Sequence, residues 1–436
     1  MSTSTKSFVR NDMLAPMAPP AAQSGAIRWM RENLFSSTLN TVLTVLGVLI
    51  IYLLVSSSLP WWLNSVWNAN SLGECRAIVV ASAGEGATGA CWAMVRERWH
   101  QFTFGFYPQH LYWRPILAFV LLFAALAPVL FAAFPRKLMI FTALYPLIAF
   151  WLLWGGSIWV PVLVLVGFVI MGAVYNALSG RLGVPVASGL GFVAAVLFWL
   201  FLDAPIAAAL DSILPIGLEK VASDQFGGFL LAITIGVTAI AFSLPLGILL
   251  ALGRQSDMLI VKSLSVGFIE FIRGVPLITL LFTASLLLQY FLPPQTNFDL
   301  ILRVVILVTF FAAAYIAEVI RGGLAALPRG QYEAADALGL DYWQAQRHII
   351  LPQALKISIP GIVSTFIGLF KDTTLVSFVG LADPLRGITT IVRADINWKG
   401  IYWEPYIFVG AIFFLFCFGM SRYSMYLERK LKTDHR

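Results

Sequence analysis

The sequence predicts an all-α integral membrane protein with about ten transmembrane helices, and three observations support this class. Of its 436 residues, 59% are hydrophobic and only 12% are charged, whereas an average soluble protein has roughly 25% charged residues. Apolar runs close to the roughly 20 residues that cross a bilayer recur along the whole chain. The basic residues behind the net charge of +7 gather at the ends of these runs. There they set orientation, so the charge does not indicate nucleic-acid binding.

Residues 1–37 are predicted to form a cytoplasmic tail that ends in a helix on the membrane surface. Residues 1–25 are rich in Ser, Pro and Ala, a composition typical of disorder. Across residues 27–35, apolar side chains fall on one helical face and charged ones on another, as expected for a helix lying on the bilayer. The first span follows at 39–59, and its length without a cleavage site predicts a retained anchor.

The segment 60–112 is the one long extramembrane stretch predicted before the C-terminal spans. Its arginines are matched by acidic residues, which places it in the periplasm by the positive-inside rule. It contains Cys75 and Cys91, and an oxidising compartment favours a disulfide between them. The alternative is two unpaired thiols in a poorly ordered loop. The third cysteine, Cys417, fits a packed small apolar side chain.

Nine further spans are predicted, and basic residues between them place both termini in the cytoplasm. They divide the chain into an extra N-terminal membrane region, 38–212, and a C-terminal five-span region, 213–436. No repeat relates the two regions. The predicted spans cover residues 116–134, 138–154, 158–175, 189–210, 226–252, 268–292, 301–320, 357–378 and 405–426.

The polar stretch 327–354 has the pattern of two short helices joined at a glycine. Pro328 suits the first turn of the first helix, and Gly339 suits the left-handed position that ends it. Asp341 and Gln344 have the spacing of a capping box for the second helix, which Pro352 is expected to end. The alanines leave little side-chain bulk, so another protein could approach this hairpin closely. A spacer between two spans and a DNA-binding helix pair are the plainer alternatives, but flanking spans and few basic residues disfavour the second.

Three motifs in order support a family resemblance. The segment 333–339, EAADALG, followed by Leu-Pro at 351–352, resembles the EAA loop of bacterial ABC importer permeases. The segment 271–277, FIRGVPL, is similar to the R-G-[TV]-P-L segment of the polar amino-acid (histidine/glutamine-type) permeases, and 371–377, KDTTLVS, resembles their K-D-[ST]-[ST]-L stretch. The resemblance covers residues 220–430. Chain length and the extra N-terminal spans resemble the longer permease subunit of general L-amino-acid importers.

This resemblance implies a type I ABC importer permease core and an importer of polar or general L-amino acids in the bacterial inner membrane. The implied partners are ATPase subunits, a second related permease in a heterodimer, a periplasmic amino-acid-binding protein and membrane lipid. ATP and Mg would be bound by the ATPase, so the chain itself is expected to hold no cofactor and to be no enzyme. The residues expected to contact the ATPase are Glu333, Ala334, Ala335, Asp336, Gly339 and Arg347.

Charged residues in or beside the C-terminal spans are candidates for a substrate pathway, because a charge at membrane depth needs a partner or water. Glu318 and Arg321 share a helical face and could form a purely structural pair; the alternative is gating or contact with a zwitterionic substrate. Lys371 and Asp372 leave the same two possibilities open. Prolines within the spans are either inert kinks or breaks that free backbone groups to line a pathway. The candidates are Glu270, Arg273, Glu318, Arg321, Lys371 and Asp372, with Pro245, Pro276 and Pro360.

Two functions from other classes remain as alternatives. A stand-alone secondary transporter or channel would work without an ATPase, and a membrane-embedded enzyme would need a reactive constellation. The sequence has no phosphate-binding Gly-x-x-x-x-Gly-Lys-[Ser/Thr] loop and no Gly-x-Ser-x-Gly elbow. Its four histidines have no metal-ligand spacing, so no metal site is expected.

Overall fold

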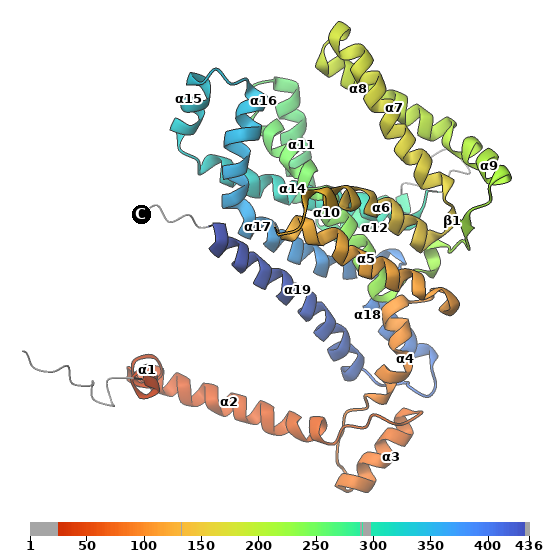
Figure 1. The fold of residues 1–436 in the computed structure, drawn as a ribbon. Coiled ribbons are helices and arrows are strands. Elements are labelled where there is room, and N and C mark those ends of the chain that lie inside the picture. The colour runs from red at the N-terminus through yellow and green to blue at the C-terminus, as the bar shows by residue number, and fades with distance from the viewer. Residues whose placement is uncertain (1–24, 132, 288–289, 291–297, 432–436) are drawn as a thin grey trace, which may run out of the picture. The chain divides into compact units, whose positions relative to one another are not determined.

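The computed structural model describes residues 25–131, 133–287, 290 and 298–431 (Figure 1). The tail before Gly25 therefore lies outside the described residues. The chain divides into two compact units, Met1–Ala93 and Met94–Arg436. Among the described residues, eight helices are long and apolar enough to cross a membrane, or up to ten if each bent helix pair counts as one span. The predicted class of all-α membrane protein is confirmed.

The described part of the first unit begins with a short helix and one candidate span. The short helix predicted across residues 27–35 is present as α1 (Gly25–Asn33), and Ser37 caps the start of α2 (Thr38–Leu63), since its hydroxyl accepts the Asn40 N–H at 3.2 Å. No residue of α2 is buried by the chain. An apolar helix exposed along its whole length is suited to contact with lipid.

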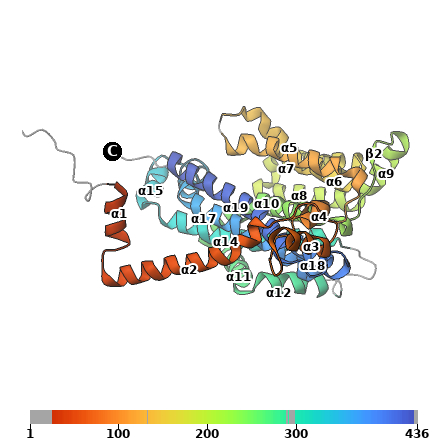
Figure 2. The ribbon, with the colours of Figure 1, turned by 90° about the horizontal axis from the view of Figure 1, so that it is seen from below.

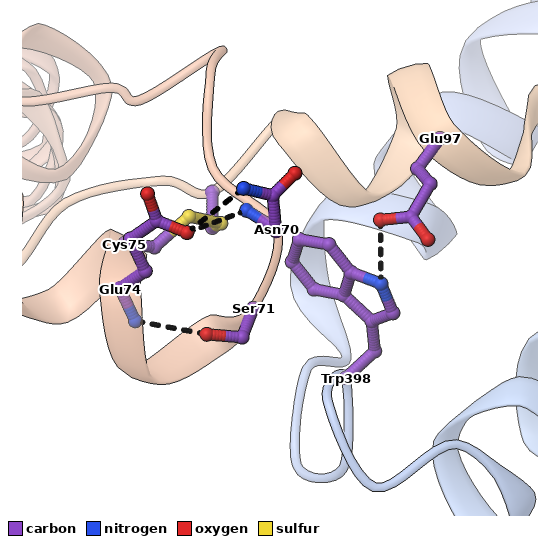
Figure 3. Close-up of a disulfide and its surroundings, with 7 residues drawn as sticks. Asn70, Ser71, Glu74, Cys75, Glu97 and Trp398 are labelled. Carbon is purple, nitrogen blue, oxygen red and sulfur yellow. Dashed lines mark hydrogen bonds between the residues drawn. A yellow bond between two sulfur atoms is a disulfide. The ribbon is translucent and has the colours of Figure 1, made fainter.

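The unit ends in a folded segment that contains α3 (Leu72–Ala83) and the two cysteines. Cys75 of α3 and Cys91 form a disulfide whose Cα atoms are 6.0 Å apart. The Ser71 hydroxyl accepts the Glu74 N–H at 3.1 Å, and the Glu74 carboxylate accepts the Asn70 N–H at 2.8 Å (Figure 3). This hydrogen bonding fixes the start of α3 beside the disulfide.

The first half of the second unit consists of a short helix, two helical hairpins and a last helix that bends away from the second hairpin. The α5–α6 pair and the α7–α8 pair each pack as neighbours, and α9 leaves α8 at 54°. Two short antiparallel strands, β1 (Gly156–Ser157) and β2 (Gly217–Leu218), join the segments before α7 and after α9. The helices are α4 (Ala93–Phe104), α5 (Trp113–Leu130), α6 (Met139–Trp154), α7 (Trp159–Leu182), α8 (Val184–Phe201) and α9 (Asp203–Ile213).

The second half is built around α14 (Leu300–Ala325), the most deeply buried of the candidate spans. It packs against α10 (Gly228–Gln255) on one side and α17 (Leu351–Asp372) on another. Near the end of α14, a Cβ on Gly323 would lie 2.1 Å from the Ser358 hydroxyl and 2.5 Å from the Ala354 carbonyl oxygen. Glycine therefore allows α14 and α17 to approach closely at this point. The remaining helices are α11 (Leu259–Gly274), α12 (Leu277–Phe282), α18 (Pro384–Ala394) and α19 (Trp403–Leu431).

The prolines behave differently from one another. The predicted span 268–292 is wrong in its bounds, because α11 begins at Leu259 and meets α12 at an angle of 102°. The break falls at Pro276, which has no N–H to donate and favours an extended residue before it; Val275 has φ −107° and ψ 131°. Pro245 and Pro360, in contrast, lie inside the continuous helices α10 and α17. Of the three, only Pro276 separates two helices.

We expect Gly323→Val to lower the free energy of unfolding by about 2 kcal/mol, since the added side chain overlaps backbone atoms of α17 and forces the helices apart. Gly322→Val is the matched control, because a Cβ there meets nothing within 4 Å. Thermal unfolding of both variants in the same detergent gives the comparison. Equal midpoints would contradict the close approach of α14 and α17.

Candidate functional site

The polar hairpin (residues 327–350) connects α14 to α17 and projects from one end of this helix pair (Figure 1). It consists of α15 (Arg329–Ala337), α16 (Tyr342–Ala345) and a π-helical segment, η6 (Gln346–Ile350). Gly339 has φ +70°, its N–H donates to the Asp336 carbonyl at 2.9 Å, and the Leu340 N–H donates to the Ala335 carbonyl at 3.2 Å. These two bonds form a Schellman motif, which requires a left-handed residue where Gly339 lies.

The capping box is present as predicted, but the second helix does not end at Pro352. The Asp341 carboxylate accepts the Gln344 backbone N–H at 2.8 Å, and the Gln344 side-chain oxygen accepts the Asp341 backbone N–H at 3.2 Å. From Tyr342 the chain continues without interruption through η6 into α17. The proline falls directly after the π-helical turn, where the hydrogen-bond register has already shifted, so its missing N–H does not end the helix. The hairpin and the span are thus one continuous helical body.

The predicted contact residues of the polar hairpin divide between its surface and its interior. Glu333, Ala334, Asp336, Gly339 and Arg347 are exposed. The second alanine of the motif points inward, and Ala335 is 1% exposed. Only one of the two alanines therefore offers its side chain to a partner.

Three large apolar side chains of the polar hairpin are exposed, and the sequence reasoning missed them. Leu338 is 73% exposed, Trp343 65% and Tyr342 52%. Their signal in the sequence is large apolar residues within a short polar stretch between spans. Exposed apolar side chains beside carboxylates and a backbone with little side-chain bulk form a surface suited to protein contact.

A cluster of five charges lies where α10, α11 and α14 meet. The Glu318 carboxylate, 15% exposed, lies 2.7 Å from Arg254, 3.1 Å from Arg321 and 3.7 Å from Arg273. Arg254 also pairs with Glu270 at 2.8 Å. Four of these residues are among the pathway candidates that the sequence predicts, but Arg254 is not, because only the fold brings it to α14. We call this set the arginine–carboxylate cluster.

Lys371 and Asp372 lie apart from the arginine–carboxylate cluster. Asp372 lines a pocket of about 290 Å³ together with Phe311, Tyr315 and Thr365, whereas Lys371 is exposed. The Arg273 guanidinium carbon lies 5.5 Å from the centre of the Tyr315 ring, within the range of a cation–π contact. Tyr315 therefore stands between the cluster and the pocket, and the predicted pathway residues form two groups that meet at this ring.

Charges grouped within a bundle of membrane-spanning helices are typical of transport pathways, so the fold and the site indicate a membrane transport protein. Residues 243–433 match the family described as binding-protein-dependent transport system inner membrane component. The chain is 74% identical over 433 residues to a glutamate/glutamine/aspartate/asparagine transport system permease protein of Rhodobacter capsulatus, covering 99% of this chain and 100% of that protein. The chain belongs to this family of ABC importer permeases.

Two further relatives differ in how much of the chain they match. An inner membrane amino-acid ABC transporter permease protein of Escherichia coli strain K12 is 39% identical over 94% of this chain and 94% of its own length. A glutamate/aspartate import permease protein of Escherichia coli O6:H1 is 34% identical over 47% of this chain and 91% of its own length. The predicted family, its longer permease form and the role of importer permease subunit are confirmed. The stand-alone transporter is not favoured.

We expect Glu318→Gln to destabilise the second unit by about 2 kcal/mol, because three partly exposed arginines lose the carboxylate that they share, which is 15% exposed. Glu270→Gln is the control, since the Glu270 side chain is 54% exposed and pairs with one arginine, and its effect should be much smaller. Thermal unfolding in one detergent measures both. If the Glu270 variant were as unstable as the Glu318 variant, the burial of a carboxylate would not determine how much its ion pairs stabilise the protein.

Proposed function

We propose that the chain works in the bacterial inner membrane as the permease for polar L-amino acids, with acidic amino acids and their amides as the first substrates to test. The permease relatives named for glutamate, glutamine, aspartate and asparagine support this choice. The single observation that carries the proposal is the polar hairpin, which presents exposed acidic and apolar groups and continues rigidly into α17.

The proposed assembly contains four kinds of subunit. Two ATPase subunits, which bind ATP and Mg, contact the polar hairpins of this chain and of a second, related permease. A periplasmic amino-acid-binding protein delivers substrate to the opposite side. Both termini of the chain face the cytoplasm in this proposal. In its support, α15 and the C-terminal end of α19 lie toward the same side of the second unit in both views (Figures 1 and 2).

The proposed substrate path passes the pocket that Asp372 lines. A free amino acid has an ammonium and a carboxylate, so it needs complementary charges close together. Asp372 would accept the ammonium, and Lys371 or the guanidinium of Arg273 behind Tyr315 would supply positive charge for the carboxylate. The pocket volume of about 290 Å³ lies near the lower end of the roughly 300–1,000 Å³ of small-molecule sites, which suits a single amino acid.

The proposed mechanism uses ATP to shift an equilibrium between two arrangements of the permease. A ligand shifts such an equilibrium only by its difference in affinity for the two states. ATP-driven closure of the ATPase would draw the polar hairpins together and move α17 with them, since no break separates hairpin from span. Access to the Asp372 pocket would then alternate between the two sides. The C-terminal region 213–436 would supply these parts.

A cysteine at Leu338 should form a crosslink to the ATPase, because this side chain is 73% exposed on the polar hairpin. Ala335→Cys is the matched control within the same turn; at 1% exposure it should give little product. Both variants are made in a Cys417→Ala background, since Cys417 is the free cysteine among the described residues. Equal yields from the two positions, or a Leu338 product with a periplasmic protein, would refute the docking of this hairpin on an ATPase.

Gly339→Asp should leave the chain inserted but abolish amino-acid uptake in proteoliposomes with the complete transporter. An added side chain is strained at φ +70°, by up to about 1 kcal/mol for aspartate, which tolerates this region better than most residues. It also adds bulk and charge at the joint between α15 and α16, so the hairpin no longer fits its partner. Gly330→Asp adds the same charge where a Cβ meets nothing within 4 Å and the backbone is helical. Normal uptake by the Gly339 variant would count against force transfer through this joint.

A further inference from the structure

A long apolar cavity within the second unit has no role in the proposed transport path. Its volume is about 740 Å³, within the roughly 300–1,000 Å³ of ligand sites. The α5–α6 hairpin forms one wall, and α10, α14 and α19 form the others. The cavity is distinct from the Asp372 pocket, with which it shares no lining residue.

The cavity exists because the α5–α6 hairpin is attached to the C-terminal helices at its two ends. At one end, the Trp154 ring stacks on Phe226, just before α10, with 4.4 Å between centroids, and the Trp154 indole N–H donates to the Ser223 hydroxyl at 2.8 Å. At the other end, the Tyr423 hydroxyl of α19 donates to the Leu130 carbonyl at 2.5 Å. Between these attachments, small side chains face the space. They are Ala118, Ala125, Ala149, Thr234, Thr238 and Ala241.

The cavity is long enough to hold the hydrocarbon of one membrane leaflet. Its lining residues on α10 run from Phe229 to Phe242, a length of about 20 Å at 1.5 Å per residue. One leaflet contributes roughly half of the 30 Å hydrocarbon core. The cavity therefore reaches from the end of the helices past the middle of the bilayer.

The one charged residue among the described residues that line the cavity lies at one end of it. Asp299, at the start of α14, and Ser223, just before α10, line this end. Of the four deeper hydroxyl groups, those of Thr142, Tyr145 and Thr234 donate to backbone carbonyls, the last to Leu230 at 2.7 Å. The Thr142 hydroxyl donates to the Ala125 carbonyl at 2.7 Å, and that of Tyr145 to the Ala118 carbonyl at 2.9 Å. A cavity with a charged residue at one end and a mainly apolar interior complements one acyl chain of an amphiphile.

We propose that an acyl chain of a membrane phospholipid occupies this cavity, with its headgroup at the Asp299 end. An apolar cavity excludes water, and an empty one forfeits the dispersion contacts of its lining. In a bilayer, the acyl chain is the apolar group present at the right depth and in excess. The bound chain fills the joint between the α5–α6 hairpin and the C-terminal helices and makes the two move as one body.

Photocrosslinking of the full chain in vesicles that contain a phospholipid with a diazirine in its acyl chain tests this proposal. Adducts are expected on cavity-lining residues of α6 and α10, such as Ala149 and Thr238. Ala149→Trp fills the cavity and should abolish the adducts on α10. Ala411→Trp places the same side chain on an exposed position of α19 and should leave them unchanged.

A second measurement is independent of crosslinking. Removal of lipid should lower the unfolding midpoint of the wild-type chain more than that of the filled variant, and Thr238→Phe serves as the filling variant if Ala149→Trp does not fold. The proposal fails if the α10 adducts persist in the filled variant, or if wild-type adducts occur only on outward residues such as Val120. Crosslinks from this cavity to a second protein chain would overturn it in favour of a subunit interface.

Discussion

The arrangement of the C-terminal helices depends on the ion pairs that the Glu318 carboxylate forms. A carboxylate that is mostly removed from water must be paired with cations, and here the cations come from three helices: Arg254 of α10, Arg273 of α11 and Arg321 of α14 itself. The pairing therefore fixes the ends of α10 and α11 against α14. A few residues further on, Gly323 lets α14 approach α17, and the polar hairpin follows.

The features of the fold that could be predicted from the sequence are those that depend on one helix or on neighbouring residues alone. Apolar run length identifies spans because the bilayer imposes the same requirement on each helix separately. The turn at Gly339 and the box formed by Asp341 and Gln344 depend only on neighbouring residues. These features are present in the structure.

The features that the sequence could not predict depend on contacts between distant segments. Arg254 joins the arginine–carboxylate cluster only because α10 packs on α14. Ala335 is buried in α15, which packs against η6 at the start of the following span. Pro352 has the local character of a helix end, yet a π-helical turn before it shifts the register and the helix continues. Docking on an ATPase, the substrate pocket and the division at residues 212–213 stay proposals. The structure adds that Phe104, Tyr107 and Leu152 share one hydrophobic core with α10 and α14.

In the proposed mechanism, the unbroken helix from Tyr342 to Asp372 would act as a lever arm of about 45 Å at 1.5 Å per residue. Its stiffness means that the displacement of one end is not absorbed by a flexible joint. A rotation of a few degrees where the ATPase would bind becomes a shift of several ångströms beside Tyr315. In that mechanism, the polar hairpin and the Asp372 pocket would therefore move together, without a relay of side chains between them.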